Sequence, residues 1–355
     1  MNRRTLLLLA CAWPSLRAHA QSKYPPVVEG SALRFPRDHG AHPTFRTEWW
    51  YLTGTLRDAA RRELGVQITF FRSRPGVAEG GTSAFAPRQL LFAHAAIADP
   101  RVARLQHDQR ALRAGFGLAE ASDTTTDVRL DDWSLKLDGE KYTASVTARD
   151  FALRLTYDAT QSLVLQGAGG VSRKGPSPAQ ASYYYSRPHL AVSGSVQRNG
   201  RDITVSGDAW LDHEWSSEYL APEARGWDWI GLNLDDGGAL MAFRIRDHHG
   251  GVYWAGGSYR DARGRLRTFA SSDVAFTPLA RWTSPRTGID YPIAFRITAG
   301  DIDLTLEPLM ADQELDSRAS VGTVYWEGAV RALAEGGAIG HGYLELTGYG
   351  AALRI

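Results

Sequence analysis

The chain has 355 residues and a formal net charge of +1 at pH 7, from 40 basic and 39 acidic residues. Its 11 Trp, 14 Tyr and 36 Gly, against only three Met, favour short strands and turns over helices. The length suits two domains, and the scattered basic residues form no run of the kind that binds nucleic acid.

The first twenty residues have the pattern of an export signal. Arg3-Arg4 precedes an apolar run at 6–12, and the small-x-small sequence at 18–20 forms a cleavage site before Gln21. The paired arginines fit twin-arginine export as well as the general secretory route. We therefore expect a mature protein in the periplasm or outside the cell.

The single cysteine, Cys11, lies within this leader, so the mature chain should have neither a disulfide nor thiol chemistry. The apolar residues before Cys11 also give a weaker match to a lipidation box. After the leader, no segment approaches the roughly 20 apolar residues that a membrane-spanning helix needs.

A segment rich in His follows, with Asp38, His39 and His42 ahead of Glu48. Imidazole and carboxylate groups are common zinc ligands, so His39 and His42 with Glu48 or Asp212 form one candidate metal site. The spacing in a Gly/Pro loop fixes no geometry, however, and capping roles explain the same residues more simply. We predict no metal and no cofactor, and we keep His39 and His42 as candidate ligand-binding residues.

The rest of the first half should consist of short strands, which we expect at 67–71, 90–97, 132–137, 142–147 and 151–157. Turn pairs Asp138-Gly139 and Arg149-Asp150 join the last three strands into a meander. The segments 75–87 and 167–181 are expected to be mobile loops that cover a barrel mouth.

The first half closes on Asp212-His213-Glu214-Trp215. Strand alternation sends Asp212 and Glu214 to one face and His213 and Trp215 to the other. If the two carboxyls point into an apolar barrel, the pKa of one should rise, and that group becomes a general acid near neutral pH. A structural role, in which both carboxylates accept hydrogen bonds from arginines and loop amides where the barrel closes, explains the pattern more simply.

The second half repeats this style, with strands expected at 239–246, 251–259, 293–297, 302–308 and 325–333. Its opening strand echoes that of the first half, because EWWYLTGTLRD from Glu48 aligns with GWDWIGLNLDD from Gly226. The closing strands echo as well: GDAWLDHEW aligns with GHGYLELTG, which places Asp212 over Glu345. We read two copies of one domain, at 21–220 and 221–355.

Aromatic residues gather on these strands. Adjacent rings in a strand face opposite sides, so one of each pair should line a barrel interior and the other should pack outside it or between the domains. Core packing explains most of them, but so many rings also suit an elongated apolar guest. The candidate ligand-binding rings are Trp49, Trp50, Tyr51, Tyr184, Trp215, Trp227, Trp229 and Trp326.

Several strings in the same order carry a resemblance to a known family. FPRDHGAHPTFRTEWWYLTG, YYYSRP, GDAWLDHEW, GWDWIGLNLDDGGALMAFRIRD, YWEGAV and GYLELTGY together resemble the AttH-like/hydroxyneurosporene synthase family of lipocalin-like proteins. The resemblance covers almost the whole mature chain. It implies an all-β protein with two tandem lipocalin-like antiparallel β-barrel domains.

The best-defined activity in that superfamily is carotenoid 1,2-hydratase, which protonates a terminal carbon–carbon double bond and lets water add to the resulting cation. Fungal relatives shape pericyclic cyclisations instead. The hydratase carries an acid and a nearby Tyr on the strand after the second Trp motif, but that strand here, 239–244, has neither. Its His-x-Trp motif resembles His213-Glu214-Trp215. Our candidate catalytic residues are therefore Asp212, His213, Glu214 and Glu48.

Two classes of function remain open. One is an exported hydro-lyase or isomerase that acts on an apolar, isoprenoid or lipid-like molecule by proton transfer from a buried carboxyl. The other is a non-catalytic carrier or accessory protein that holds an apolar ligand beside a transport system of the envelope. The first predicts that Glu214→Gln abolishes turnover, and the second that Trp229→Ala weakens binding.

Overall fold

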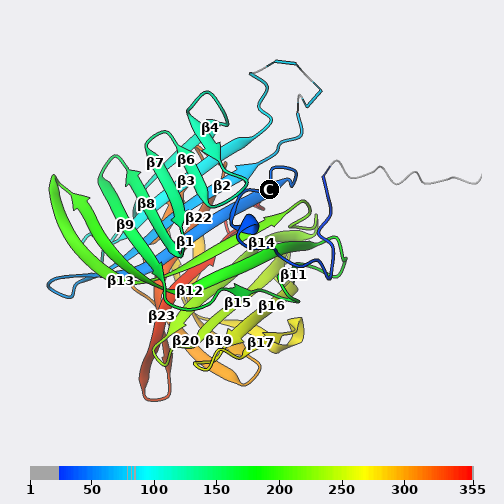
Figure 1. Cartoon of the computed structure of the whole chain (residues 1–355). Helices are drawn as coiled ribbons and strands as arrows, with labels where there is room; N and C mark the ends of the chain where they lie inside the picture. Colours follow the sequence, from blue (N-terminus) through cyan, green and yellow to red (C-terminus); the bar gives the residue numbers. More distant parts are fainter. Residues whose placement is uncertain (1–23, 78, 81, 84, 354–355) are drawn as a thin grey trace, which may run out of the picture.

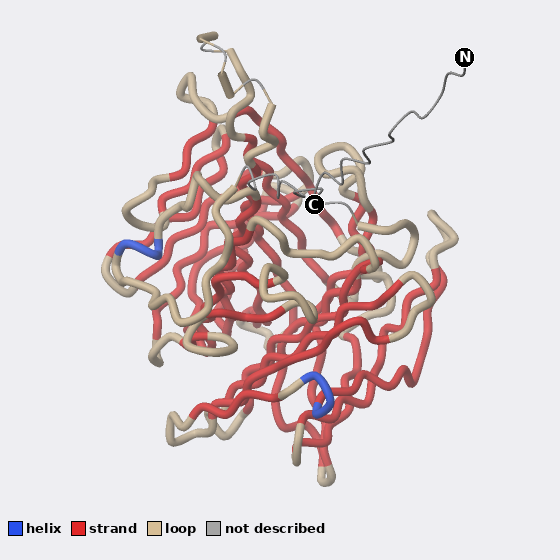
Figure 2. Tube along the Cα trace, turned by 90° about the vertical axis from the view of Figure 1, so that its right-hand side faces the viewer, coloured by secondary structure: helices blue, strands red, loops and turns tan. Residues whose placement is uncertain are grey.

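The computed structural model describes residues 24–77, 79–80, 82–83 and 85–353. The expected export signal lies outside these residues. Within them the protein consists of strands and loops, and the only helical elements are the 3-10 turns η1 (Arg37–His39) and η2 (Ser271–Asp273) (Figure 2). No helix in this described part is long and apolar enough to cross a membrane.

The first half of the chain forms one antiparallel sheet of 13 strands, in the order β4-β3-β2-β1-β13-β12-β9-β8-β7-β6-β5, with β10 and β11 paired to β12 (Figure 1). Its strands are β1 (Thr47–Asp58), β2 (Glu63–Ser73), β3 (Leu90–Ala98), β4 (Gln106–Arg113), β5 (Ala119–Ala121), β6 (Asp127–Leu130), β7 (Trp133–Asp138), β8 (Lys141–Thr147), β9 (Phe151–Ala159), β10 (Val164–Leu165), β11 (Val171–Arg173), β12 (Ala181–Arg198) and β13 (Arg201–Ser216).

The second half forms a 10-stranded antiparallel sheet, in the order β17-β16-β15-β14-β23-β22-β20-β19-β18, with β21 paired to β22. Its strands are β14 (Ala224–Leu234), β15 (Ala239–Asp247), β16 (Val252–Arg260), β17 (Leu266–Phe269), β18 (Val274–Thr283), β19 (Asp290–Ala299), β20 (Ile302–Pro308), β21 (Glu314–Asp316), β22 (Val324–Ala334) and β23 (Gly337–Leu346).

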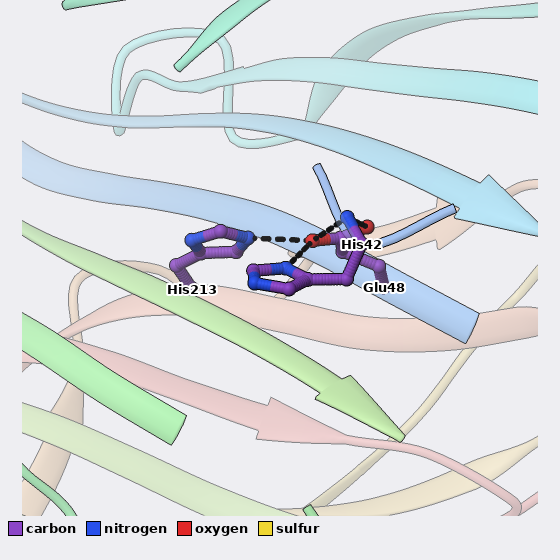
Figure 3. Close-up of side chains that lie close together, drawn as sticks. All are labelled: His42, Glu48 and His213. Carbon is purple, nitrogen blue, oxygen red and sulfur yellow. Dashed lines mark hydrogen bonds and ion pairs between the residues drawn. The ribbon is translucent and has the colours of Figure 1, made fainter. Parts of the chain in front are cut away.

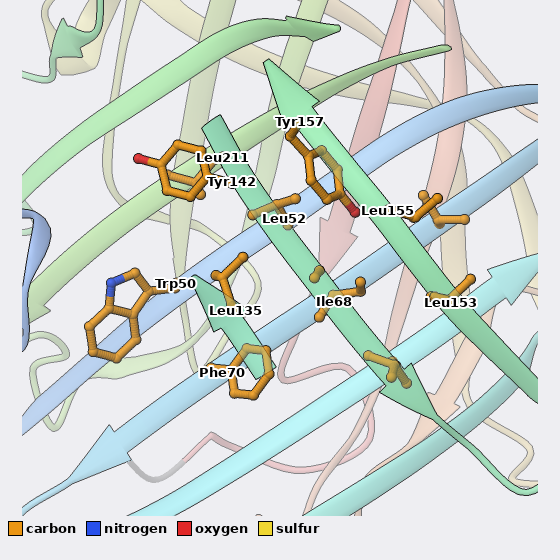
Figure 4. Close-up of a cluster of buried hydrophobic side chains, with 14 of the residues drawn as sticks. Trp50, Leu52, Ile68, Phe70, Leu135, Tyr142, Leu153, Leu155, Tyr157 and Leu211 are labelled. Atoms are coloured by element: carbon orange, nitrogen blue, oxygen red, sulfur yellow. The ribbon is translucent and has the colours of Figure 1, made fainter. Parts of the chain in front are cut away.

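Each sheet curls around its own apolar core. In the first sheet β4 and β3 approach β6, so the barrel nearly closes, and side chains such as Trp50, Leu52 and Phe70 fill its interior (Figure 4). In the second, β15 and β16 approach β18 around a core that includes Phe295 and Trp326. The predicted all-β fold of two tandem lipocalin-like barrels is confirmed.

Strands β1 and β14 occupy equivalent places, as the sequence echo predicts. Strand β1 lies between β13 and β2, and β14 lies between β23 and β15. Tyr51 stands opposite Asp212 in the first pair, and Trp229 stands opposite Glu345 in the second. The echo between Asp212 and Glu345 is thus a positional equivalence in the two sheets.

The two barrels pack through the outer faces of these strands. An apolar cluster between them includes Tyr51, Trp210, Trp229, Phe243 and Tyr343. The approach is close, because a Cβ at Gly65 of β2 would lie 2.8 Å from both Ala329 Cβ and the Tyr343 hydroxyl oxygen. Small residues at such points let the outer faces of the two sheets meet.

The segment 167–181, expected to be a mobile loop, is tied into the first sheet. It contains β11, which pairs with β12, and it carries Lys174, whose side chain is buried between the barrels. This difference from the sequence prediction matters because Lys174 contributes to the site described next.

Candidate active site

Strand β13 presents its residues to two different environments, as alternation predicts. His213 and Trp215 point into the first barrel and pack among its core residues, whereas Asp212 and Glu214 face the second sheet. The sequence hypothesis that the two carboxyls point into a barrel interior needs correction. They lie on the outer face of the first barrel, where the second barrel covers them.

A cavity of about 80 Å³ separates the barrels at this point, and we call it the inter-barrel chamber. Both sheets contribute to its walls. Its lining residues are Thr47, Trp49, Tyr51, Thr69, Phe71, Asp212, Glu214, Tyr219, Trp227, Trp229, Tyr325, Glu327 and Glu345. Six of these are Trp or Tyr and four are carboxylic acids, so the chamber combines apolar walls with an unusual density of acid groups.

Asp212 accepts hydrogen bonds from three neighbours. The Trp210 indole nitrogen lies 2.7 Å from Oδ1, the Tyr184 hydroxyl lies 2.6 Å from Oδ2, and the Ser186 hydroxyl also donates to Oδ1. Burial nevertheless raises the pKa of Asp212 to about 7, because these bonds only partly offset the loss of solvation. The group therefore exists in both protonation states near neutral pH.

Glu214 differs from Asp212 because it has a positive partner. Lys174 Nζ lies 2.8 Å from Glu214 Oε1, and Ser182 donates a further hydrogen bond to the same oxygen. The ammonium also lies 4.3 Å from the centroid of the Phe243 ring and 4.9 Å from that of Tyr184. Burial raises the pKa of Glu214, and the charge of Lys174 opposes this rise. The pair fixes Glu214 in place rather than leaving it free for a ligand.

The second barrel supplies the other two acids. Glu327 of β22 stands directly opposite Glu345 of β23, and Glu327 is only 2% exposed. Burial, then the charge of Glu345, raises the pKa of Glu327 well above its ordinary value. Burial also raises the pKa of Glu345 to about 7, although the Trp227 indole nitrogen donates to Oε2 at 2.9 Å. Neither oxygen of Glu327 has a hydrogen-bond partner of ordinary geometry among the described residues.

A second cavity of about 330 Å³ adjoins the chamber, and we call it the vestibule. The two cavities share Thr47, Phe71, Trp227, Tyr325 and Glu345 as lining residues. The vestibule adds apolar side chains from Phe92, Val321 and Leu353. It also adds polar side chains, which are Arg72, Ser73, His94, Ser320, Thr323 and Thr347. The two cavities together lead from walls of mixed polarity to a group of acids.

His94 lines the vestibule and bonds to Tyr325, which lines both cavities. Its ring is fully buried, with Nδ1 2.7 Å from the Tyr325 hydroxyl and Nε2 2.9 Å from the Ser320 hydroxyl. Burial lowers the pKa of His94 to about 3, so the ring is neutral and holds Tyr325 in a fixed orientation.

A separate polar cluster lies inside the first barrel, formed by His42, Glu48 and His213 (Figure 3). Glu48 Oε1 lies 2.8 Å from His42 Nδ1 and 2.9 Å from His213 Nε2, while Arg72 Nε lies 2.7 Å from Oε2. The His42 ring stacks on Trp215 with 3.6 Å between centroids. This His–Glu–His cluster lines neither cavity.

The charges in this cluster are fixed by its partners. Burial alone would raise the pKa of Glu48, but Arg72 and the two histidines outweigh it and hold the pKa well below its ordinary value. Burial lowers the pKa of His213 to about 4 against the pull of Glu48. Glu48 is thus an ionised, fully bonded carboxylate, which does not fit the expected role of proton donor.

The same cluster is a plausible ligand set for a metal, since its ligand atoms all lie within 4.8 Å of one another. Its geometry fits a hydrogen-bond network better. Both imidazoles bond to one oxygen of Glu48, and the Arg72 guanidinium already neutralises the carboxylate. We assign it no metal.

The candidate residues therefore divide into three groups. Asp212, Glu214, Trp49, Tyr51, Trp227 and Trp229 line the chamber, and Tyr184 bonds to Asp212 behind it. Glu48, His213, His39, His42, Trp50 and Trp215 lie together in the first barrel, away from both cavities. Trp326 belongs to the core of the second barrel, where its indole nitrogen donates to the Ala311 carbonyl.

Three charged residues in or beside the chamber escaped prediction as site residues, which are Glu345, Glu327 and Lys174. Glu345 had a signal in the sequence, because it aligns with Asp212. Glu327 sits beside Trp326 in a largely apolar strand, a pattern like that of Glu214 and Trp215. Lys174 had no signal, because its segment lacks strand periodicity.

The comparisons with known proteins agree with this architecture. Residues 26–349 match the AttH-like family model. The chain belongs to the AttH-like family. A candidate AttH from Nitrosomonas europaea shares 52% sequence identity with this AttH-like protein and superposes with a TM-score of 0.87, over 92% of this chain and 99% of that one. No curated protein matches the sequence.

More distant structures share the fold. Kievitone hydratase from Nectria haematococca is 15% identical, with a TM-score of 0.70 over 93% of this AttH-like chain and 97% of its own. CghA in a structure with Sch210972 is 11% identical, with a TM-score of 0.54 over 86% and 88%. At these identities the likeness concerns the fold alone.

Proposed function

We propose that this protein is an enzyme that adds water to, or rearranges, a carbon–carbon double bond of an apolar small molecule in the inter-barrel chamber. One observation carries the proposal. Asp212 and Glu345, equivalent positions in the two sheets, face the same aromatic-walled cavity, and each has a pKa of about 7. Near neutral pH one of them can hold a proton while the other accepts one.

The chemistry follows from this pairing. The protonated carboxyl gives its proton to one carbon of the double bond, and a carbocation forms at the other carbon. Trp49, Trp227 and Trp229 present ring faces and edges to the cavity, and aromatic rings stabilise a cation. Water then adds to the cation and loses a proton to the second carboxylate. In a rearrangement, the cation instead loses a proton from a neighbouring carbon to the same base.

Glu327 and Glu214 assist without carrying the proton. Burial, followed by the charge of Glu345, holds the pKa of Glu327 well above its ordinary value, so Glu327 stays neutral beside Glu345. The charges of Asp212 and Glu214, after burial, help to raise the pKa of Glu345. Glu214 is paired with Lys174, which leaves the Asp212–Glu345 couple as the acids with adjustable protonation. Two of the distant relatives of the same fold are named as a hydratase and as a protein bound to Sch210972, which supports a small-molecule substrate.

The decisive experiment begins with the ligand. The protein is purified from its native host, its organic extract is identified by mass spectrometry, and the recovered molecule is returned to the protein in H₂¹⁸O and in D₂O. We expect ¹⁸O in a hydration product, or deuterium on carbon after a rearrangement. Asp212→Asn and Glu345→Gln should each lower the rate at least 100-fold, whereas Glu307→Gln, on the exposed side of β20, should leave it unchanged.

A carrier predicts a different result. A molecule that binds stoichiometrically and returns without either isotope would refute the enzyme proposal and establish the carrier function. Loss of binding and of thermal stability together in Asp212→Asn would likewise reduce the carboxyl to a structural role.

The pattern of residues 1–20 leads us to propose that the protein works after export. Fractionation of the native host with an antibody to the mature chain tests this: periplasmic or secreted protein that begins at Gln21 is expected, and full-length protein in the cytosol would contradict it.

A further inference from the structure

The chamber contains polar atoms that the protein itself does not satisfy. Both carboxyl oxygens of Glu327 and the hydroxyl of Tyr51 are buried and line the chamber. The Tyr51 and Tyr325 hydroxyls lie close enough to Glu327 to lower its pKa, but neither makes a hydrogen bond of ordinary geometry with it, and Tyr51 has no other such partner among the described residues. Buried polar groups without partners are costly, and native proteins retain few of them. The other polar groups of the chamber are occupied, since Asp212 has three donors, Glu214 has Lys174, and Tyr325 is bonded to His94.

The neighbours of Glu327 and Tyr51 indicate which kind of ligand group would form hydrogen bonds with these polar atoms. Glu327 keeps its proton because it is buried opposite Glu345, so it is a hydrogen-bond donor as well as an acceptor. Tyr51, whose ring packs edge-on against Trp229 with 5.2 Å between centroids, has a hydroxyl that donates one hydrogen bond. Two neutral donors that converge on one small cavity are complementary to an oxygen atom with two lone pairs.

The lining of the vestibule indicates the charge and polarity of the rest of the ligand. Phe92, Val321 and Leu353 give the vestibule apolar surface beside neutral Ser and Thr side chains. No lysine lines either cavity, and the single arginine there, Arg72, is bonded to Glu48. A ligand with a negatively charged end would meet four acids in the chamber and no free cation among its lining residues. The apolar body of a ligand would lie in the vestibule and its oxygen in the chamber.

We infer that the substrate is an uncharged apolar molecule that carries a hydroxyl or carbonyl oxygen, held by Tyr51 and Glu327, rather than a pure hydrocarbon. This inference rests on the proposed function, because it names the substrate class of that same site. It assigns Tyr51 and Glu327 as residues that recognise substrate, and it places the double bond between that oxygen and the vestibule, within reach of Asp212 and Glu345.

A binding cycle tests the inference without any turnover. The probes are farnesol and farnesene, which share a carbon skeleton and differ in the hydroxyl. Affinities are measured by quenching of tryptophan fluorescence for the unmodified protein, Tyr51→Phe and Glu327→Gln. For each protein we take the ratio of the dissociation constants for farnesol and farnesene, and we compare this ratio between the variants. The two probes differ in their free energy of transfer out of water, but this difference is the same for every variant and cancels in the comparison. A hydrogen bond to a buried partner predicts that Tyr51→Phe lowers the preference for farnesol about tenfold.

Tyr142→Phe is the matched control. The Tyr142 hydroxyl is also buried and makes no hydrogen bond of ordinary geometry among the described residues, but it lies in the core of the first barrel rather than in the chamber. It should leave the preference for farnesol unchanged. Tyr51→Phe should unfold close to the temperature of the unmodified protein, since the hydroxyl makes only a poorly aligned contact with Glu327, so misfolding will not mimic the effect.

Three outcomes would overturn the inference. The first is the same ratio of dissociation constants in Tyr51→Phe and in the unmodified protein. The second is a preference for farnesene that Glu327→Gln does not change, and the third is no binding of either probe. The failure of the proposed function looks different. Glu345→Gln should keep the preference for farnesol, so a protein that discriminates between the probes but shows no isotope incorporation refutes the catalysis and leaves the recognition of an oxygen intact.

Discussion

Glu327 and Glu345 stand directly opposite each other on β22 and β23, so the second barrel holds two acids at adjacent positions of its outer face. Like charges at such positions repel, and burial strengthens the repulsion. At most one of the two carboxyls therefore ionises readily at neutral pH. The other keeps a proton that an exposed carboxyl would have lost at this pH.

The first prediction concerns that proton. Because burial holds the pKa of Glu327 well above its ordinary value, an infrared pH titration should detect a protonated carboxyl band that persists to higher pH than the bands of exposed carboxyls. The band should disappear in Glu327→Gln and persist in Glu307→Gln. A spectrum without the band, or one that Glu327→Gln leaves unaltered, would show that Glu327 ionises normally.

Asp212 gives a prediction about stability and pH. Its pKa rises from 3.8 in the unfolded chain to about 7 in the folded protein, so between these values the folded state holds a proton that the unfolded state has released. The free energy of unfolding therefore falls as the pH rises through this window, by about 4 kcal/mol from this group alone. Urea unfolding should show that Asp212→Asn gains stability relative to the unmodified protein between pH 5 and pH 8. A constant difference across that range would contradict the raised pKa.

Lys174 and Glu214 should behave as a coupled buried pair. Lys174→Met leaves Glu214 without its positive partner and should cost about 3–5 kcal/mol in the free energy of unfolding at pH 8. The double variant Lys174→Met/Glu214→Gln should recover much of this loss, because no unpaired charge remains. Chemical unfolding of the two single variants and the double variant measures the coupling, and additive losses would show that the ion pair contributes little.

The ion pair of Arg72 and Glu48 should contribute more to the free energy of unfolding than an exposed pair of the same type. Arg72 is 2% exposed and its carboxylate partner is fully buried, so Arg72→Met should destabilise the first barrel by about 3–5 kcal/mol. Arg57 bonds to Glu63 on the surface, and Arg57→Met should cost less than about 1 kcal/mol. Similar losses in the two variants, measured by urea unfolding, would contradict the difference.

The sequence predicted the fold well because strand alternation and the internal echo are local signals. The period of two separated Asp212 and Glu214 from His213 and Trp215 correctly. It did not tell which face of β13 points into the barrel, since both environments are buried and both accept aromatic neighbours. Because of that ambiguity, the sequence pattern alone places Glu48 and His213 among the same candidate catalytic residues as Asp212 and Glu214.

The missing part of the site depends on how the two barrels dock. Glu327 meets Glu345 through the pairing of β22 with β23, and both meet Asp212 only when the outer faces of the sheets come together. The approach of these three acids arises from tertiary packing, which cannot be read from a sequence motif. Lys174 is harder still, because a buried cation on a short connecting segment resembles any surface lysine in the sequence.

The alternation in β13 also limits how the gene can change. A substitution alters one side chain, but the insertion or deletion of a single codon in this strand would reverse the two faces beyond it. His213 and Trp215 would move toward the chamber, and the acids would enter a barrel core that has no partners for them. We expect natural homologues to vary in residue type along β13 while its length between Asp212 and Trp215 stays constant.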